Sequence, residues 1–228
     1  MNLIIQYKSQ QESRMATNNS PYHLPICINN KGAELLSQGK IHESRVLLLD
    51  ALQCAKKIAI TLRRQLTRNI NKSDTLDFHF LTPIPLTVES ETFLFTRPIQ
   101  ILEMKELAGR QAIAGEVTSA IVFNVSLGFH AEGLRGSKQL AQALRGYEVA
   151  LGLRQYRSRV TSPLLDMGLF NNLAHIHVER SAYDSAKRCF SNMVYLMKRL
   201  DKTALDEVDL GGFTSGALWQ VPTCAPVA

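Results

Sequence analysis

Three asparagines occupy matching positions in three similar stretches of the chain, and their side chains suit the recognition of another chain's backbone. They are Asn30, Asn124 and Asn172. The stretches around them cover residues 28–35, 122–129 and 170–177. An asparagine amide both donates and accepts hydrogen bonds, so a row of them could pair with the peptide groups of an extended segment. The sequence leaves one alternative open, in which each asparagine caps or bridges neighbouring helices.

The same stretches share a column of small residues, which predicts that helices cross closely there. Gly32, Ser126 and Ala174 fall in one register. Two helices whose backbones approach each other need such residues at the point of contact. Repetition of this kind is typical of stacked helical hairpins. We therefore expect a mainly α-helical protein, an α-solenoid of about three hairpins.

The first hairpin has the most regular pattern. Pro25 suits the first position of a helix, and Gly39 suits the left-handed residue that ends it. A second helix should follow, because apolar residues recur there at steps of three and four. These residues are Leu48, Leu52, Ala55, Ala59, Leu62 and Leu66.

The later hairpins carry similar signals. Pro163 should start the first helix of the third hairpin. Ser181 resembles the N-cap of the next helix, with Asp184 in its first turn. The middle hairpin fits only with an enlarged turn at residues 133–137, and three unrelated amphipathic hairpins would give a similar overall pattern.

Residues 70–115 differ in character and are predicted to form an insert between the first and second hairpins. Residues 77–80 and 92–96 are rich in aromatic and β-forming side chains, and prolines flank them. One interpretation is a β-hairpin that lies on the helices, because an isolated hairpin is only marginally stable. A disordered loop is the other interpretation. The expected boundaries are a flexible tail at 1–24, a helical domain at 25–200 and a C-terminal tail at 201–228.

Few other residues could carry chemistry. His175 and His177 lie two apart on a predicted helix, so they point in different directions and suit a metal poorly, although His130 could approach His175 from a neighbouring helix. The sequence contains no P-loop, G-x-S-x-G or H-E-x-x-H motif. The four cysteines are scattered, which favours free thiols in a reducing compartment. We therefore expect a protein that is not an enzyme and that uses no cofactor or metal.

The charge of the chain allows a second kind of partner. The 228 residues are 45% apolar and carry a net charge of +6, which permits contact with RNA or acidic proteins. Basic residues gather in and beyond two predicted second helices. They are Lys56, Lys57, Arg63, Arg64, Arg68 and Lys72, and then Arg135, Lys138, Arg145, Arg154, Arg157 and Arg159. They could form a solvated surface or a stripe that tracks phosphates.

No apolar run is long enough to predict a membrane span. The expected location is therefore cytoplasmic or nuclear, and no membrane contact is expected. The segment 9–20 is rich in Gln, Asn and Ser, and it leaves a weak organelle-targeting signal open as an alternative to a disordered tail.

From Ile28 to Leu52 the chain resembles a tetratricopeptide repeat without a gap. Gly32 takes the small position of the first helix, Gly39 the turn and Ser44 the small position of the second helix. The chain thus resembles the tetratricopeptide-like superfamily and is similar to uncharacterised members from microalgae.

This resemblance implies a scaffold or adaptor that binds a peptide or a partner helix in the groove lined by the first helices of the hairpins. RNA binding through the basic second helices is the alternative, and homo-oligomerisation stays open. The cationic clamp of the chaperone-binding members is absent here. The implied partner-binding positions are Asn29, Asn30, Phe123, Asn124, Leu127, His130, Asn171, Asn172 and His175.

Overall fold

The protein is mainly α-helical, with six helices and one small antiparallel sheet in the residues that the structure describes. The computed structural model describes residues 21–65, 76, 78–86, 94–102, 110–134, 137–155 and 163–200. The elements are α2 (His23–Ser37), α3 (Ile41–Gln65), β1 (Phe78–Phe80), β2 (Ile99–Ile101), α4 (Arg110–Gly133), α5 (Ser137–Gln155), α6 (Pro163–Glu179) and α7 (Tyr183–Met197). The predicted mainly helical class is therefore confirmed. Most of the predicted tails, residues 1–20 and 201–228, lie outside the described part of the chain.

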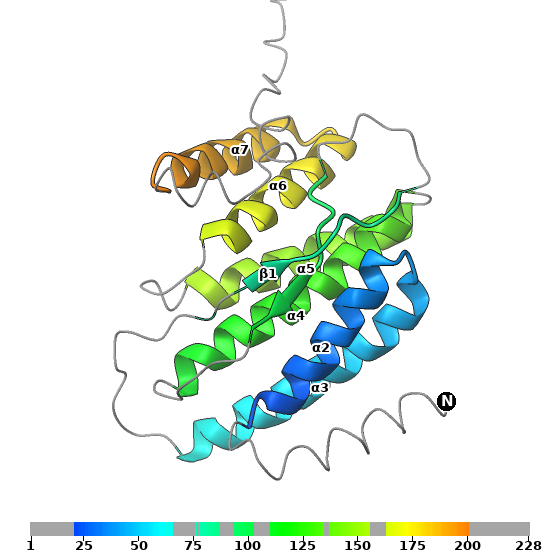
Figure 1. The fold of residues 1–228 in the computed structure, drawn as a ribbon. Helices are drawn as coiled ribbons and strands as arrows, with labels where there is room; N and C mark the ends of the chain where they lie inside the picture. The colour runs from blue at the N-terminus through cyan, green and yellow to red at the C-terminus, as the bar shows by residue number, and fades with distance from the viewer. Residues whose placement is uncertain are drawn as a thin grey trace, which may run out of the picture. The chain divides into compact units, whose positions relative to one another are not determined.

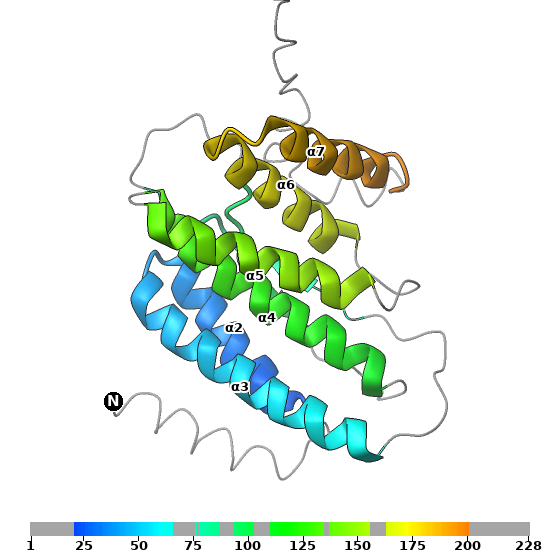
Figure 2. The same ribbon diagram turned by 180° about the vertical axis from the view of Figure 1, so that it is seen from behind.

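The chain divides into two compact units. Unit 1 contains residues 1–87 and 96–162, and unit 2 contains residues 88–95 and 163–228. In unit 1, α2 packs on α3, α3 on α4 and α4 on α5, while α2 and α4 also contact β2. Figure 1 shows the sheet on the α2 and α4 side of this unit, and Figure 2 shows α3 and α5 on the opposite side. Unit 2 contains the α6–α7 hairpin.

The close crossing predicted at Gly32 is present between α2 and α3. A β-carbon placed on Gly32 would lie 2.7 Å from Cδ2 of Leu48, too close for a real contact. The Ser44 hydroxyl donates a 2.7 Å hydrogen bond to the Gly32 carbonyl at the same crossing. A similar crossing joins α4 and α5, where a β-carbon on Gly146 would lie 2.0 Å from Oγ of Ser126. Small residues therefore allow both helix pairs of unit 1 to pack closely.

The first helix ends as the sequence predicts, although it begins earlier. Gly39 has a φ of 76°, and its N–H bonds the Leu36 carbonyl while the Lys40 N–H bonds the Leu35 carbonyl. This pair of hydrogen bonds defines a Schellman motif. Pro25 is the third residue of α2, not the first, because the helix begins at His23. The proline still costs no hydrogen bond there, since N–H groups in the first turn have no partner within the helix.

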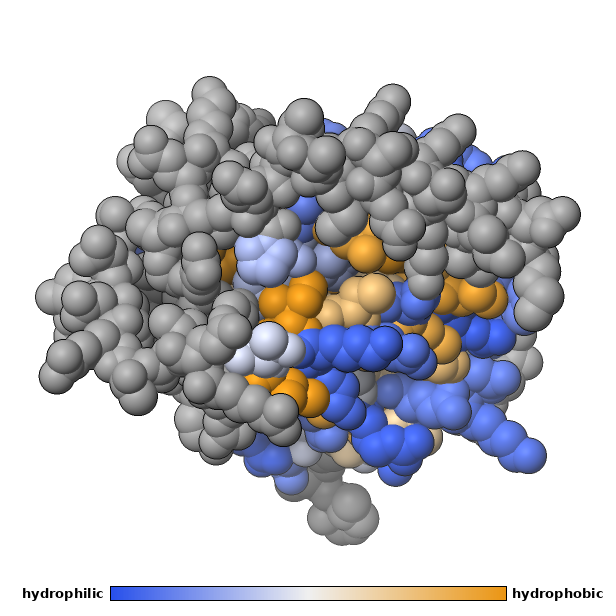
Figure 3. All heavy atoms as spheres, turned by 90° about the horizontal axis from the view of Figure 1, so that it is seen from below, coloured by the Kyte–Doolittle hydropathy of each residue, from blue (hydrophilic) through white to orange (hydrophobic). Residues whose placement is uncertain are grey.

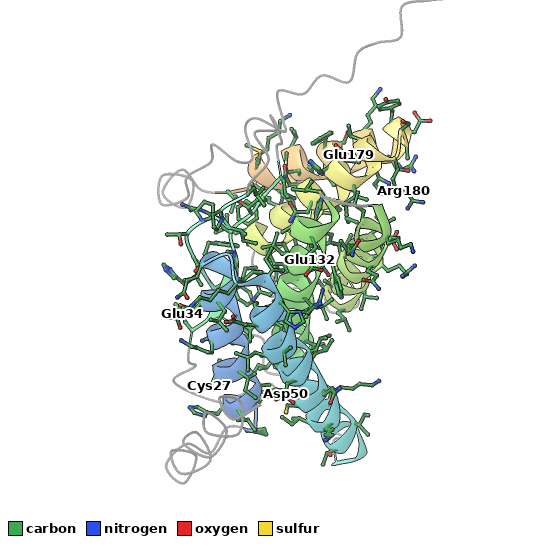
Figure 4. All side chains as sticks on the ribbon, turned by 90° about the vertical axis from the view of Figure 1, so that its right-hand side faces the viewer. Cys27, Glu34, Asp50, Glu132, Glu179 and Arg180 are labelled. Atoms are coloured by element: carbon green, nitrogen blue, oxygen red, sulfur yellow. The ribbon has the colours of Figure 1, made fainter. Side chains whose placement is uncertain are left out.

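The assignment of Ser181 as an N-cap is wrong. Ser181 has a φ of 57°, and the N-cap position of α7 belongs to Ala182. The Ser181 N–H bonds the Val178 carbonyl and the Ala182 N–H bonds the His177 carbonyl. Ser181 thus closes α6 in the way that Gly39 closes α2, just after Glu179 and Arg180 at the end of the helix (Figure 4). The expected start of α6 at Pro163 and the acidic first turn of α7 at Asp184 are both present.

The insert contains two antiparallel strands, as the β-hairpin interpretation predicts, but the second strand lies at other residues than expected. Phe78 pairs with Ile101, His79 with Gln100 and Phe80 with Ile99 in an antiparallel register. The second strand is therefore 99–101, not the expected 92–96. The insert is also shorter than 70–115, because α4 already begins at Arg110.

The surface of the described residues mixes polar and apolar side chains. Figure 3 shows hydrophobic side chains interspersed with hydrophilic ones on one face. The exposed large apolar side chains of unit 1 are Val46, Leu49, Ile60, Leu102 and Val149. Glu132 at the end of α4 (Figure 4) forms an ion pair with Arg45 of α3.

Among the helices that the structure describes, none combines the length and the apolar character needed to cross a membrane.

Candidate functional site

Asn124 holds both peptide groups of one strand residue. Its Oδ1 accepts the N–H of Ile99 at 2.8 Å, and its Nδ2 donates to the carbonyl of the same residue at 2.7 Å. Both residues are fully buried. A buried peptide group without a hydrogen-bond partner costs free energy. This pair of hydrogen bonds therefore fixes the backbone of β2 to α4 at a specific residue.

Asn30 repeats this arrangement one step along the strand. Its Oδ1 accepts the N–H of Ile101 at 2.8 Å, and its Nδ2 donates to the Ile101 carbonyl at 2.8 Å. Asn29 links the two positions, since its Nδ2 bonds both the Ile99 carbonyl and Oδ1 of Asn30 at 3.2 Å. Its own Oδ1 accepts from Nδ2 of Asn124 at 3.0 Å. We call Asn29, Asn30 and Asn124 the amide cluster.

The extended strand offers its two edges to different partners. In a strand, alternate residues point their N–H and C=O groups to opposite edges. The even-numbered residues face the β1 side, where the Leu81 N–H bonds the Pro98 carbonyl and the Ile84 N–H bonds the Thr96 carbonyl. The odd-numbered Ile99 and Ile101 face the amide cluster. The strand is therefore held on one edge by backbone and on the other by side-chain amides.

Unit 2 contains one asparagine that pairs with both the N–H and the carbonyl of a single residue. Oδ1 of Asn172 on α6 accepts the N–H of Phe95 at 2.9 Å, and its Nδ2 donates to the Phe95 carbonyl at 3.0 Å. Both residues are buried. All three asparagines singled out by their shared register thus bind an extended backbone, and in each case that backbone belongs to the chain's own insert.

The remaining predicted partner-binding positions lie in the interior. Phe123 and His130 pack on Tyr147 of α5, with ring centroids 5.7 and 5.8 Å away, so they contribute to the α4–α5 hairpin and do not line an open groove. Leu127 is fully buried. Asn171 is buried in unit 2 and its Nδ2 lies 3.5 Å from Oδ1 of Asn172.

His175 is also buried in unit 2, at 2% exposure. Burial lowers the pKa of His175 from 6.5 to about 4, because the charged imidazolium loses its hydration. The side chain is therefore neutral at physiological pH. Within the described ranges there is no group of three or more His, Cys, Asp or Glu side chains that could hold a metal ion.

Cys27, Cys54 and Cys189 carry thiols that form no disulfide. Burial raises the pKa of Cys189 to about 11, and the nearby Arg188 opposes this only in part. The thiol of Cys189 thus stays protonated near neutral pH and is a poor nucleophile.

The basic stretches are less available to phosphates than their sequence indicates. Arg154 is 2% exposed and forms a 2.6 Å ion pair with Glu116 of α4, so its charge is neutralised inside the α4–α5 hairpin. The exposed basic side chains of the two stretches are Lys56, Lys57, Lys138 and Arg145. The side chains of Arg63, Arg64, Arg68, Lys72, Arg135, Arg157 and Arg159 lie outside the described part.

The segment bound by the amide cluster was not among the expected site residues. Its sequence signal is the alternation of Ile99, Gln100 and Ile101, which is typical of a half-buried strand. Pro98 obscured this signal, because proline usually marks the end of a strand. Pro98 is compatible with this strand because it pairs with Leu81 through its carbonyl, which accepts the Leu81 N–H.

The chain matches no protein-family model, no curated protein and no solved structure.

Proposed function

We propose that this protein is an interaction scaffold that binds an extended segment of a partner protein across the first helices of its hairpins. The supporting observation is the bidentate pairing of Asn30 and Asn124 with one strand residue each. Such pairing recognises the N–H and C=O groups that every non-proline residue carries. It is therefore suited to hold a polypeptide of variable sequence in a defined register.

The proposed architecture behind this function is a short tetratricopeptide-like solenoid. It is supported by the repeated close crossings at Gly32 and Ser126 and by the matching helix ends at Gly39 and Ser181. In such an array, equivalent positions recur along one face. An asparagine at the same register in successive hairpins would then present amides at regular intervals. The proposed function is binding and not catalysis.

The proposal is tested by competition with the chain's own strand. The full-length protein is immobilised, proteins from the native cell are captured, and retained proteins are challenged with a synthetic peptide of residues 94–102. We expect the peptide to release the partner, because both need the same side-chain amides.

The matched control is a peptide of the same sequence with N-methyl groups on Ile99 and Ile101. These two methyl groups remove the N–H donors that Asn124 and Asn30 accept, so this peptide should release nothing. The proposal fails if no protein is retained above background, or if the retained protein resists the unmodified peptide.

A further inference from the structure

The segment that is hydrogen-bonded to the amide cluster has properties of both a peptide ligand and a strand of the fold. Each hydrogen bond that its described residues make with the cluster uses the backbone N–H or carbonyl of Ile99 or Ile101. Its own side chains add apolar burial, since Ile99 and Ile101 are both 0% exposed. A separate extended peptide with the same two features could therefore make the same contacts.

We propose that residues 94–102 act as an exchangeable intramolecular ligand, which a partner segment must displace to bind the amide cluster. This inference rests on the proposed function and names the partner's chemistry and the regulation of the same site. The partner is an extended segment with β-branched apolar side chains two residues apart.

Each requirement on the partner follows from one contact. The residues that replace Ile99 and Ile101 need an N–H, because Oδ1 of Asn124 and of Asn30 accepts from it, and proline is therefore excluded at both. Their side chains must fill the fully buried space of the two isoleucines. Proline is acceptable at the position before the first of them, because Pro98 uses only its carbonyl.

Covalent connection makes the chain's own segment a strong competitor. A tethered ligand has an effective concentration on the order of millimolar, so a partner of equal intrinsic affinity binds weakly while the segment is in place. Any change that weakens the segment should raise the apparent affinity of the partner. Changing an asparagine instead weakens both competitors, and the two effects oppose each other.

The test converts the segment into a separate peptide without altering the site. Protease sites are introduced into 88–93 and 103–109, which lie outside the described residues, and the full-length protein is cleaved at both. A fluorescent peptide of residues 94–102 is then titrated against the intact and the cleaved protein, and circular dichroism reports whether each is folded. The N-methylated peptide is the control ligand.

We expect the cleaved protein to remain folded, to exchange its cut segment for the labelled peptide and to bind it at least tenfold more tightly than the intact protein does. Equal binding to both forms would overturn the inference, because it would show that the segment does not compete. Unfolding after cleavage, or a cut segment that never exchanges, would also overturn it, because the segment would then be a fixed strand of the core. A protein partner released by the peptide in the capture experiment would leave the proposed function standing in either case.

A second variant tests the inference without cleavage. Ile101→Ala removes buried apolar surface from the segment and leaves Asn30 and Asn124 intact. It should raise the affinity for the labelled wild-type peptide several-fold. Leu102→Ala changes a neighbouring side chain that is 45% exposed and should leave this affinity unchanged. An Ile101→Ala protein that is folded and binds the peptide no better than the Leu102→Ala protein would contradict the inference.

Discussion

At the scale of single residues, we expect the buried asparagines to contribute more to the stability of the fold than their exposed neighbours. Asn124→Ala removes the acceptor of the Ile99 N–H, whereas the Ile99 carbonyl keeps its bond from Asn29. The buried Ile99 N–H and Oδ1 of Asn29 each lose the hydrogen bond that they made with Asn124, and we expect a loss of about 1–3 kcal/mol in the free energy of unfolding. Urea denaturation followed by circular dichroism measures this change.

The control for that substitution is Lys31→Ala on α2. Lys31 forms an ion pair with Glu34, labelled in Figure 4, and both side chains are at least 36% exposed. Exposed pairs contribute about 0–1 kcal/mol. An equal effect of the two substitutions would argue against the asparagine contact described above.

The buried His175 predicts a dependence of stability on pH. Its folded-state pKa of about 4 lies below the ordinary histidine pKa of 6.5, so between these values the unfolded chain binds a proton that the folded chain does not. The contribution of His175 to stability is therefore nearly constant above pH 7 and is lost as the solution is acidified toward pH 4. The expected loss from this residue is about 2 kcal/mol between pH 7.5 and pH 5.

Urea unfolding at both pH values should show this loss in the wild type. His175→Gln removes the titrating group, so the corresponding part of the pH dependence should disappear. An unchanged pH dependence in the variant would mean that other groups are responsible for it.

At the scale of helices, the contacts of two glycines predict opposite outcomes for the same substitution. In Gly32→Ala the new β-carbon meets the Leu48 side chain at 2.7 Å, and overpacking of this kind should destabilise by about 1–3 kcal/mol. In Gly152→Ala the new atom has no neighbour within 4 Å. This second change should stabilise by about 0.5–1 kcal/mol, because alanine favours a helix. Thermal melts of both variants that shift in the same direction would contradict the close crossing of α2 and α3.

The two matching helix ends allow a paired test. Ser181 adopts a left-handed conformation that favours glycine, so Ser181→Gly should stabilise by about 0.5–1 kcal/mol. Gly39→Ser places the reverse change at the equivalent position and should destabilise, all the more because a β-carbon there would lie 3.0 Å from Pro85. Melting temperatures of the two variants should move in opposite directions, and a loss of stability in Ser181→Gly would count against the assigned role of this residue.

The helices and their crossings could be predicted from the sequence because their signals are local. Small residues at Gly32 and Ser126 and the terminating Gly39 act within one hairpin. The second strand could not be placed in this way, because Ile99 and Ile101 contact asparagines that are distant in sequence. The role of Ser181 could not be predicted from its residue type, because serine is found at helix N-caps more often than in a left-handed conformation at a helix end.

At the scale of the whole molecule, the chain's own insert occupies the positions that a partner was expected to fill. The register of Asn30, Asn124 and Asn172 indicated that an extended backbone could be bound. It could not indicate which chain supplies that backbone, because this depends on how residues 94–102 fold back after the first hairpin. The buried pairing of Arg154 with Glu116 is a second long-range contact of this kind, and it removes a cation from the stripe expected for RNA.

The most direct test of the amide cluster is the hydrogen exchange of two backbone N–H groups, measured by NMR. We predict that the amides of Ile99 and Ile101 exchange far more slowly than those of an unstructured peptide, because each donates to a side-chain oxygen in the interior. In Asn124→Ala the protection of Ile99 should fall selectively, and Asn30→Ala should affect Ile101 instead. Exchange of both amides in the wild type at the rate of an unstructured peptide would contradict the account.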